Sequence, residues 1–355
     1  VFNERIEFDG KYITDEDPET ITDRVCSAAD KMVSEGKESP TEFEIVTAIA
    51  FLYFKEKGAD YVVLEVGLGG RGDSTNIVKE PLCSVVTSIS LDHTDRLGET
   101  IPEIAMEKAG IIKKGCPVVS GSRDDEAKAV LRKTATDMGA PFFDAARIVP
   151  KVVKSDMKGS VFSAEILGRE HKGINISMAG DYQIDNAVTA LYAIELLRKQ
   201  NKTDITSREI REGMENAKNI GRMEVLNENP WIIIDGAHNP DGAKSLKTTI
   251  EKNFKGKKIL MVLGILADKE VDEVLHTFKD ITLDYVSTCP QNPRALAAAE
   301  LSGKIISMGG NAVTADSPSD AVKIAMGKRD DYDIILFAGS LYLIGSVRQE
   351  IIGLI

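Results

Sequence analysis

The chain has 355 residues, 43% of them hydrophobic and 28% charged, which is ordinary for a globular protein and long enough for two domains. A formal net charge of −12 argues against a protein that binds a nucleic-acid backbone through bulk charge. The four cysteines form no CxxC pair, and no apolar run approaches the roughly 18 residues of a membrane span. We therefore expect reduced thiols, a cytoplasmic location, no zinc site, and neither a membrane nor a nucleic acid as partner.

The first part of the chain already reads as folded sequence. It opens on Val1-Phe2-Asn3-Glu4-Arg5-Ile6 without an initiator methionine, so we expect it to begin part-way into a domain. The first predicted helix starts at Thr41, whose hydroxyl suits an N-cap and pairs with Glu44 in a capping box. Apolar residues then recur at helical spacing, and Gly58 ends the helix.

Strands and helices alternate after this point, which indicates a parallel α/β sheet. The elements expected in this block are strands at 61–66, 83–89 and 117–120 and a helix at about 101–112. Short strand-like pieces then indicate a small antiparallel addition, at 152–153, 161–166 and 174–177. A helix is expected to follow at 185–199.

A second α/β block begins near Gly221. Its expected strands are 232–235, 259–263, 285–288 and 334–337, with helices that include 241–253 and 319–326. We therefore predict two α/β domains: a first at 1–220, with a parallel sheet plus the antiparallel addition, and a Rossmann-like second at 221–355.

The most informative stretch is 65–76, with the sequence E-V-G-L-G-G-R-G-D-S-T-N. A buried strand is predicted to end at the carboxylate of Glu65 and to open into a loop with four glycines in six residues. Glycine N–H groups can approach an anion closely, and Glu65 is suited to holding a hard cation such as Mg²⁺. A tight strand-to-helix turn, whose glycines serve only geometry, explains the loop equally well.

Two more polar residues of the first block are candidates for chemistry. His93 follows the strand 83–89, and ligands bind at the carboxyl ends of strands in open α/β sheets, so Glu65 and His93 are expected to converge on a divalent metal. Lys108 has apolar helix neighbours, and desolvation would lower its pKa and free its amine to react or bind phosphate. The alternatives are a loop or capping histidine and a surface lysine.

The second block also has polar residues at its strand ends. Asp235 ends one strand and is suited to accepting hydrogen bonds from ribose hydroxyls, and Arg222 is suited to pairing with a phosphate. Ser340 follows the last strand as a helix cap, and the N–H groups beyond it are suited to a carboxylate. On physical grounds alone, purely structural roles explain these residues as well. Residues 235–240 would then form a turn and a helix cap, and Ser340 would only cap its helix.

Five segments in this order, 65–76, 91–94, 107–111, 235–240 and 339–342, resemble the folylpolyglutamate synthase/dihydrofolate synthase family of the Mur ligase-like superfamily. The opening 2–6 and the helix start 41–44 are similar to that family as well, so the resemblance covers essentially the whole chain. It implies a monomeric, Mg²⁺-dependent enzyme with ATP, L-glutamate and a folate or dihydropteroate as substrates. The folate or pteroate carboxylate attacks the γ-phosphate of ATP to give an acyl phosphate, and the amine of glutamate then displaces phosphate.

The resemblance implies a role for each matching residue. Glu65 and His93 match the magnesium ligands of the family, and Lys108 matches a lysine that is carbamylated there. The residues that match nucleotide contacts are Asn186, Arg222 and Asp235. The residues that match the closure over the acyl phosphate and the incoming glutamate are His238 and Ser340. The residues that match the pterin side of the pocket are Thr41, Glu42, Phe43, Glu44, Gly72, Asp73 and Ser74.

The chain departs from the family because it contains no G-x-x-G-K-S phosphate-binding loop. In the family that loop lies shortly before the segment that matches 2–6, so we expect weak or no ligase activity from these 355 residues alone. The alternatives are a non-catalytic folate- or nucleotide-binding protein and another Mur-type amino-acid ligase. A nicotinamide-dependent oxidoreductase is disfavoured, since the glycine run sits mid-domain with no second fingerprint.

Overall fold

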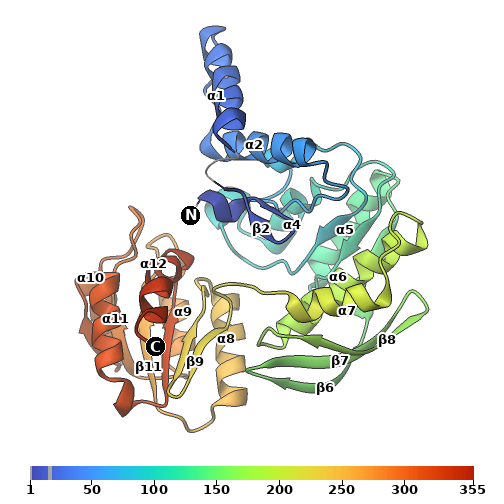
Figure 1. Cartoon of the computed structure of the whole chain (residues 1–355). Helices are drawn as coiled ribbons and strands as arrows, with labels where there is room; N and C mark the ends of the chain where they lie inside the picture. Colours follow the sequence, from blue (N-terminus) through green and yellow to red (C-terminus); the bar gives the residue numbers. More distant parts are fainter. Residues whose placement is uncertain (1, 15–17) are drawn as a thin grey trace.

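The computed structural model describes residues 2–14 and 18–355. Its strands fall into an N-terminal hairpin, a three-stranded parallel sheet, a three-stranded antiparallel sheet and a six-stranded sheet. The six-stranded sheet and its helices form the lower left of the molecule in Figure 1. They belong to residues 221–355, which are called the second half below; the other sheets belong to the described residues before 221, called the first half. This is the two-part α/β architecture that the sequence predicts; the division at residue 220 remains a prediction.

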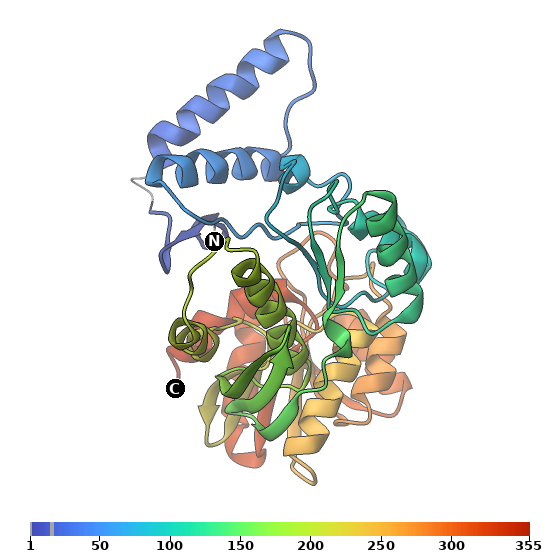
Figure 2. The same cartoon turned by 90° about the vertical axis from the view of Figure 1, so that its right-hand side faces the viewer.

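A helical arm precedes the first parallel sheet. It consists of η1 (Phe2–Arg5), β1 (Glu7–Phe8), β2 (Lys11–Tyr12), α1 (Pro18–Ser34) and α2 (Glu42–Lys57). These elements share a small apolar core of their own, and α1 lies at the outer end of the molecule in both views (Figure 1, Figure 2). The predicted capping box is confirmed, because the Thr41 N–H donates to Glu44 (2.7 Å) and the Glu44 N–H to the Thr41 hydroxyl (3.3 Å). Gly58, with φ 69°, ends α2 as predicted.

The parallel sheet of the first half has the order β3-β4-β5. It is built from β3 (Ser84–Val86), β4 (Val118–Ser120) and β5 (Phe142–Asp144), with η2 (Ser74–Ile77), α3 (Thr94–Leu97), α4 (Ile101–Ala109), α5 (Asp125–Asp137) and η3 (Ala145–Arg147) between and beside the strands. Every residue of β4 is buried, because β4 lies between two strands and under α5 and α6 (Tyr182–Lys199).

The predicted antiparallel addition is confirmed. Its strands are β6 (Lys151–Asp156), β7 (Gly159–Ile166) and β8 (Arg169–Ile176), in the order β6-β7-β8. Phe162, Ile166 and Ile174 are fully buried against α6, while α7 (Ser207–Asn216) contacts β8. The sheet therefore extends the core of the first half toward the second.

The six-stranded sheet has the order β13-β12-β11-β14-β10-β9, parallel except for β9. Its strands are β9 (Glu224–Glu228), β10 (Trp231–Ile234), β11 (Ile259–Leu263), β12 (Asp284–Ser287), β13 (Asn311–Thr314) and β14 (Ile334–Ala338). Its helices are α8 (Pro240–Asn253), α9 (Val271–Phe278), α10 (Ala298–Ser307), α11 (Pro318–Gly327), η4 (Arg329–Asp331) and α12 (Leu341–Ile352). All residues of β11 and β14 are buried between two apolar clusters, one on each face of the sheet.

The predicted strand at 61–66 is wrong. Within the described chain no strand pairs with this segment, and the side chain of Val63 is 96% exposed. An apolar run forms a strand only where a neighbour supplies hydrogen bonds and burial, and here none does. The predicted helix 101–112 is confirmed but shorter, since α4 ends at Ala109.

Candidate active site

The second-half candidates lie at the carboxyl ends of neighbouring parallel strands. Asp235 follows β10, and Gly339 and Ser340 follow β14, which lies between β10 and β11. Gly339 adopts φ 105°, and a Cβ there would lie 2.7 Å from the carbonyl oxygen of Gly264, so this turn requires glycine. Ser340 is buried and caps α12, its hydroxyl accepting from the Tyr342 N–H at 3.1 Å. The capping interpretation of Ser340 is thereby confirmed.

Asp235 is held by backbone groups on both carboxylate oxygens. They accept from the N–H groups of Met223 and Ala237, each at 2.7 Å. Burial raises the pKa of Asp235, and these two hydrogen bonds and the charge of Arg222 oppose the shift. Asp235 therefore fixes the loop that carries Arg222 against the end of β10.

The predicted nucleotide residues gather around the start of α6. Ala179, just before α6, is buried in one apolar cluster with Met223 and Ala237, which flank Arg222 and Asp235 in the chain. Burial raises the pKa of Tyr182, the charge of Asp235 raises it further, and the charge of Arg222 opposes the shift. Asn186 stands one helical turn after Tyr182, is exposed, and donates to Gln183 at 3.2 Å. The structure thus brings the α6 start from one half beside Arg222 and Asp235 from the other.

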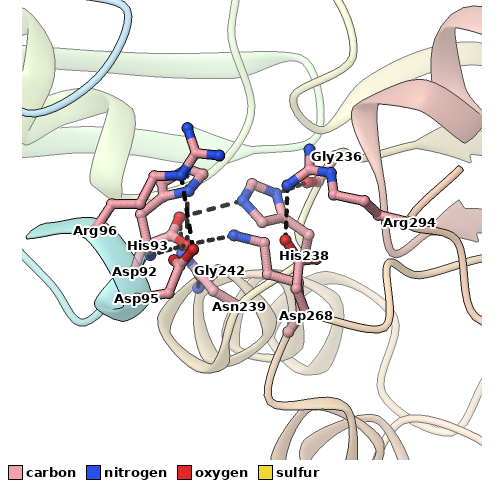
Figure 3. Close-up of polar contacts among 11 residues, drawn as sticks. Asp92, His93, Asp95, Arg96, Gly236, His238, Asn239, Gly242, Asp268 and Arg294 are labelled. Atoms are coloured by element: carbon pink, nitrogen blue, oxygen red, sulfur yellow. Dashed lines mark hydrogen bonds and ion pairs between the residues drawn. The ribbon is translucent and has the colours of Figure 1, made fainter. Parts of the chain in front are cut away.

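Asp92 joins the two halves. Its Oδ2 accepts from His238 Nε2 (3.2 Å) and Asn239 Nδ2 (2.9 Å), and its Oδ1 lies 2.5 Å from Lys269 Nζ. Asp92 and His238 point toward each other in Figure 3. Burial alone would raise the pKa of Asp92, but the hydrogen bonds and charges of His238 and Lys269 lower it far below its usual range. The carboxylate is an anion with three donors from the opposite half.

His93, next to Asp92, adopts an unusual backbone conformation. Its φ is 52° and its ψ 40°, a left-handed geometry that costs a non-glycine residue free energy and is frequent at functional sites. It precedes α3, but its side chain makes no capping hydrogen bond, so the capping alternative is not supported. Burial lowers the pKa of His93, and the charge of Asp92 opposes this shift.

The structure brings no complete metal site together. Within residues 2–14 and 18–355, no group of three or more His, Cys, Asp or Glu side chains is arranged to hold a metal. Glu65 is exposed, and no hydrogen bond or ion pair within those ranges engages it. The predicted convergence of Glu65 and His93 therefore remains a prediction.

Lys108 lies in the last turn of α4. Burial lowers the pKa of Lys108, and the charge of Asp92 opposes the shift. No ion pair within the described ranges engages Lys108, so its amine is not committed to a structural partner. The environment fits the partly desolvated lysine that the sequence predicts.

The glycine loop packs tightly on its neighbours. A Cβ at Gly67 would meet the Phe43 ring at 2.8 Å, and one at Gly70 would meet the Glu107 carbonyl oxygen at 2.8 Å. The Arg71 N–H donates to the same Glu107 carbonyl at 3.0 Å. Close packing on α2 and α4 therefore accounts for these glycines, as the geometric alternative predicts.

The predicted pterin-side residues lie where α2 meets that loop. Asp73 accepts from the N–H groups of Gly67 (2.9 Å) and Leu68 (3.1 Å), and the hydroxyl of Ser74 lies 3.0 Å from that of Thr47. Phe43 packs on Gly67, whereas a Cβ at Gly72 would meet no atom of the described residues within 4 Å. Thr41 and Glu44 are engaged in the capping box, and Glu42 pairs with Arg5 at the exposed edge (3.3 Å).

Sequence reasoning missed Asp92, Asn239 and Lys269 as site residues. Asp92 and Asn239 lie inside the segments 91–94 and 235–240 that it singled out. Lys269 follows β11, so the rule that ligands bind at carboxyl strand ends would have found it.

Comparisons with known proteins identify the family of the chain. The profile of the Mur ligase middle domain matches residues 19–194, and that of the Mur ligase glutamate ligase domain matches 221–341. The chain is 37% identical to the dihydrofolate synthase/folylpolyglutamate synthase of Bacillus subtilis (strain 168), over 99% of this chain and 81% of that protein. It is 35% identical to the folylpolyglutamate synthase of Lacticaseibacillus casei, with the same coverage. This chain belongs to the folylpolyglutamate synthase/dihydrofolate synthase family.

Solved structures of this family share the fold. Mycobacterium tuberculosis folylpolyglutamate synthase complexed with ADP and AMPPCP has a TM-score of 0.89 at 29% identity, over 99% of this chain and 82% of that one. E. coli FolC in complex with DHPP and ADP has a TM-score of 0.86 at 30% identity, over 98% of this chain and 78% of that one. The Mur ligase-like α/β fold predicted from the sequence is thus confirmed, and the family is one of ATP-dependent ligases. Across the described ranges, no helix combines the length and apolar character needed to cross a membrane.

Proposed function

We propose that this chain ligates L-glutamate to the carboxylate of a folate or dihydropteroate, using ATP and an acyl-phosphate intermediate. The observation that carries the proposal is the meeting of Asp92 with His238 and Asn239 across the two halves, in a chain that belongs to this family. Positioning of two substrates in one site is the main catalytic task of such a ligase. We further propose that it acts as a cytoplasmic monomer.

The nucleotide would lie where α6 meets the loop that follows residue 220. Arg222 would pair with a phosphate through its guanidinium fork, and Asn186 would face the nucleotide from α6. Asp235 holds that loop with both oxygens, yet each oxygen keeps a second lone pair for a ribose hydroxyl.

Glu65 and His93 would hold Mg²⁺. Their donor atoms are compatible with it: the Glu65 carboxylate is exposed and unengaged within the described ranges, and the His93 ring makes no capping bond. Mg²⁺ keeps several waters and needs only one or two protein ligands beside the phosphates. When bound, the ion would neutralise charge on the phosphate oxygens during transfer.

Thr41, Phe43, Asp73 and Ser74 would line the pterin side, which the packing of α2 on the glycine loop supports. Glu42, Glu44 and Gly72 belong to the same proposed surface. His238 and Ser340 would close the second half over the acyl phosphate and the incoming glutamate.

Lys108 gives the first specific prediction. A carbamate forms on a neutral amine, and burial favours that state. We expect Lys108→Ala to lower the turnover number of the natural protein at least 100-fold, with partial rescue by acetate or formate. Wild-type turnover in Lys108→Ala would remove the carbamate from the account.

A substrate panel tests the function and its rivals. The natural protein, ATP and radiolabelled glutamate are incubated with tetrahydrofolate, dihydropteroate or a UDP-sugar peptide. We expect labelled product with one or both pterins and none with the peptide. Product with the peptide alone would favour another Mur-type ligase, and folate binding without turnover would favour a non-catalytic binder.

A further inference from the structure

We propose that Asp92 is a positioning residue: its carboxylate is the docking point that holds the second half of the chain, through Lys269, over the first-half site during ligation. The inference rests on the proposed function. Both oxygens of Asp92 accept from the second half, and Oδ1 also accepts from a local donor. Oδ1 accepts from the His93 N–H (2.8 Å) and from Lys269, and Oδ2 accepts from His238 and Asn239.

The three distant donors stand on two separate loops of the second half. His238 and Asn239 follow β10, and Asn239 also caps α8 by accepting from the Gly242 N–H at 2.8 Å. Lys269 follows β11, two residues before α9. Because the donors come from two strand ends, their joint engagement fixes the orientation of the six-stranded sheet and not only its distance.

The loop that carries Lys269 is itself braced. The Ala267 N–H donates to the Arg294 carbonyl (2.8 Å), and the Arg294 side chain binds Asp268 at 2.7 Å. The last contact appears in Figure 3 beside the Asp92 cluster. A rigid loop transmits the position of Asp92 to the whole sheet, which a freely moving lysine would not do.

The ion pair between Lys269 and Asp92 is more buried than another lysine–aspartate pair between the two halves, Lys252 with Asp181. The side chains of Lys269 and Asp92 are only 8% and 23% exposed. Lys252 on α8, which pairs with Asp181 at 2.6 Å, is 41% exposed, and Asp181 is 55% exposed. Removing one partner from a desolvated pair leaves an uncompensated charge, whereas exposed pairs contribute little. Lys252 is therefore a matched control.

The position along the chain links the contact to catalysis. Asp92 directly precedes His93, whose backbone is held in a left-handed conformation, and its charge acts on Lys108. When the second half docks on Asp92, the His238 ring is held 3.2 Å from the carboxylate that precedes His93. Docking thus places His238, the proposed closure residue, at the site that holds His93 and Lys108. In this role Lys269 does not touch a substrate.

The test compares Lys269→Met, Lys269→Arg, Asp92→Asn, the double variant Asp92→Asn/Lys269→Met and the control Lys252→Met in the natural protein. We expect Lys269→Met to lower kcat at least 10-fold while KM for ATP changes less than 3-fold, and Lys269→Arg to retain more activity. The double variant should lose no more than Asp92→Asn alone, because the two residues act through one contact. Lys252→Met should keep kcat within 2-fold.

Small-angle X-ray scattering with AMPPCP and Mg²⁺ supplies a readout independent of turnover. Lys269→Met and Asp92→Asn should show a larger radius of gyration than wild type, and Lys252→Met should not. Wild-type kcat in Lys269→Met, multiplicative losses in the double variant, or an unchanged radius of gyration would each overturn the inference. An inactive wild-type protein would instead overturn the proposed function, and the scattering comparison would still decide the docking role.

Discussion

The sheet of the second half and the segment 61–66 have the same sequence character and opposite structures. The strand β14 is an apolar run whose residues are all buried between two neighbouring strands. The segment 61–66 is also mostly apolar, with Glu65 its one charged residue, yet no strand of the described chain pairs with it and Val63 is 96% exposed. An apolar run therefore reports a tendency to form a strand, and the presence of a neighbour decides the outcome.

Hydrogen exchange should give the largest contrast between these two regions. Backbone amides of β14 donate within a six-stranded sheet and should exchange only on global unfolding of the second half. Amides of 61–66 should exchange at nearly the rate of an unstructured peptide, measured by mass spectrometry of the 355-residue chain. Strong protection at 61–66 would mean that these amides are paired in solution.

Truncating a side chain should lower the free energy of unfolding by several kcal/mol more in β14 than in the segment 61–66. Leu336 in β14 is fully buried, so Leu336→Ala should lower the free energy of unfolding by about 2–5 kcal/mol. Val63→Ala should change it by less than about 0.5 kcal/mol. Urea unfolding followed by circular dichroism and by fluorescence of Trp231, the single tryptophan, measures both. Equal losses would contradict the difference in burial.

Two glycines extend the comparison to the loops. Gly339 has φ 105° and no room for a Cβ, so Gly339→Ala should cost about 1–3 kcal/mol. At Gly72, in the glycine loop of the first half, a Cβ would meet no atom of residues 2–14 and 18–355 within 4 Å, and Gly72→Ala should be nearly neutral for stability. Thermal unfolding of both variants checks this, and a tolerated Gly339→Ala would show that the β14 turn can relax.

The smallest expected effect concerns the exposed ion pair between the halves, Lys252 with Asp181. Burial alone would raise the pKa of Asp181, but hydrogen bonds from Lys252 and Ser155 and the charge of Lys252 lower it. A lowered pKa stabilises the fold above the unfolded value of about 3.9, and this contribution is lost as pH falls through the folded value. Lys252→Met should cost less than about 1 kcal/mol at pH 7, and this cost should shrink as the pH falls below the unfolded value. A cost that does not change with pH would reflect lost packing.

Local pattern predicted the second half well, since the expected strands 259–263 and 334–337 match β11 and β14. Buried parallel strands read as continuous apolar runs, which are easy to recognise. The arm helix α1 went unpredicted although Ile21 and Val25 stand at helical spacing. Contacts such as Asp92 with Lys269, 177 residues apart, depend on how the halves pack, and no local pattern encodes that.

The most direct test of the central claim is oxygen transfer. The natural protein is given ATP, glutamate and a folate or dihydropteroate whose reacting carboxylate carries ¹⁸O. If that carboxylate attacks the γ-phosphate and glutamate then displaces phosphate, each phosphate released carries one ¹⁸O from the carboxylate. Glutamyl product accompanied by unlabelled phosphate would contradict an acyl phosphate formed at this site.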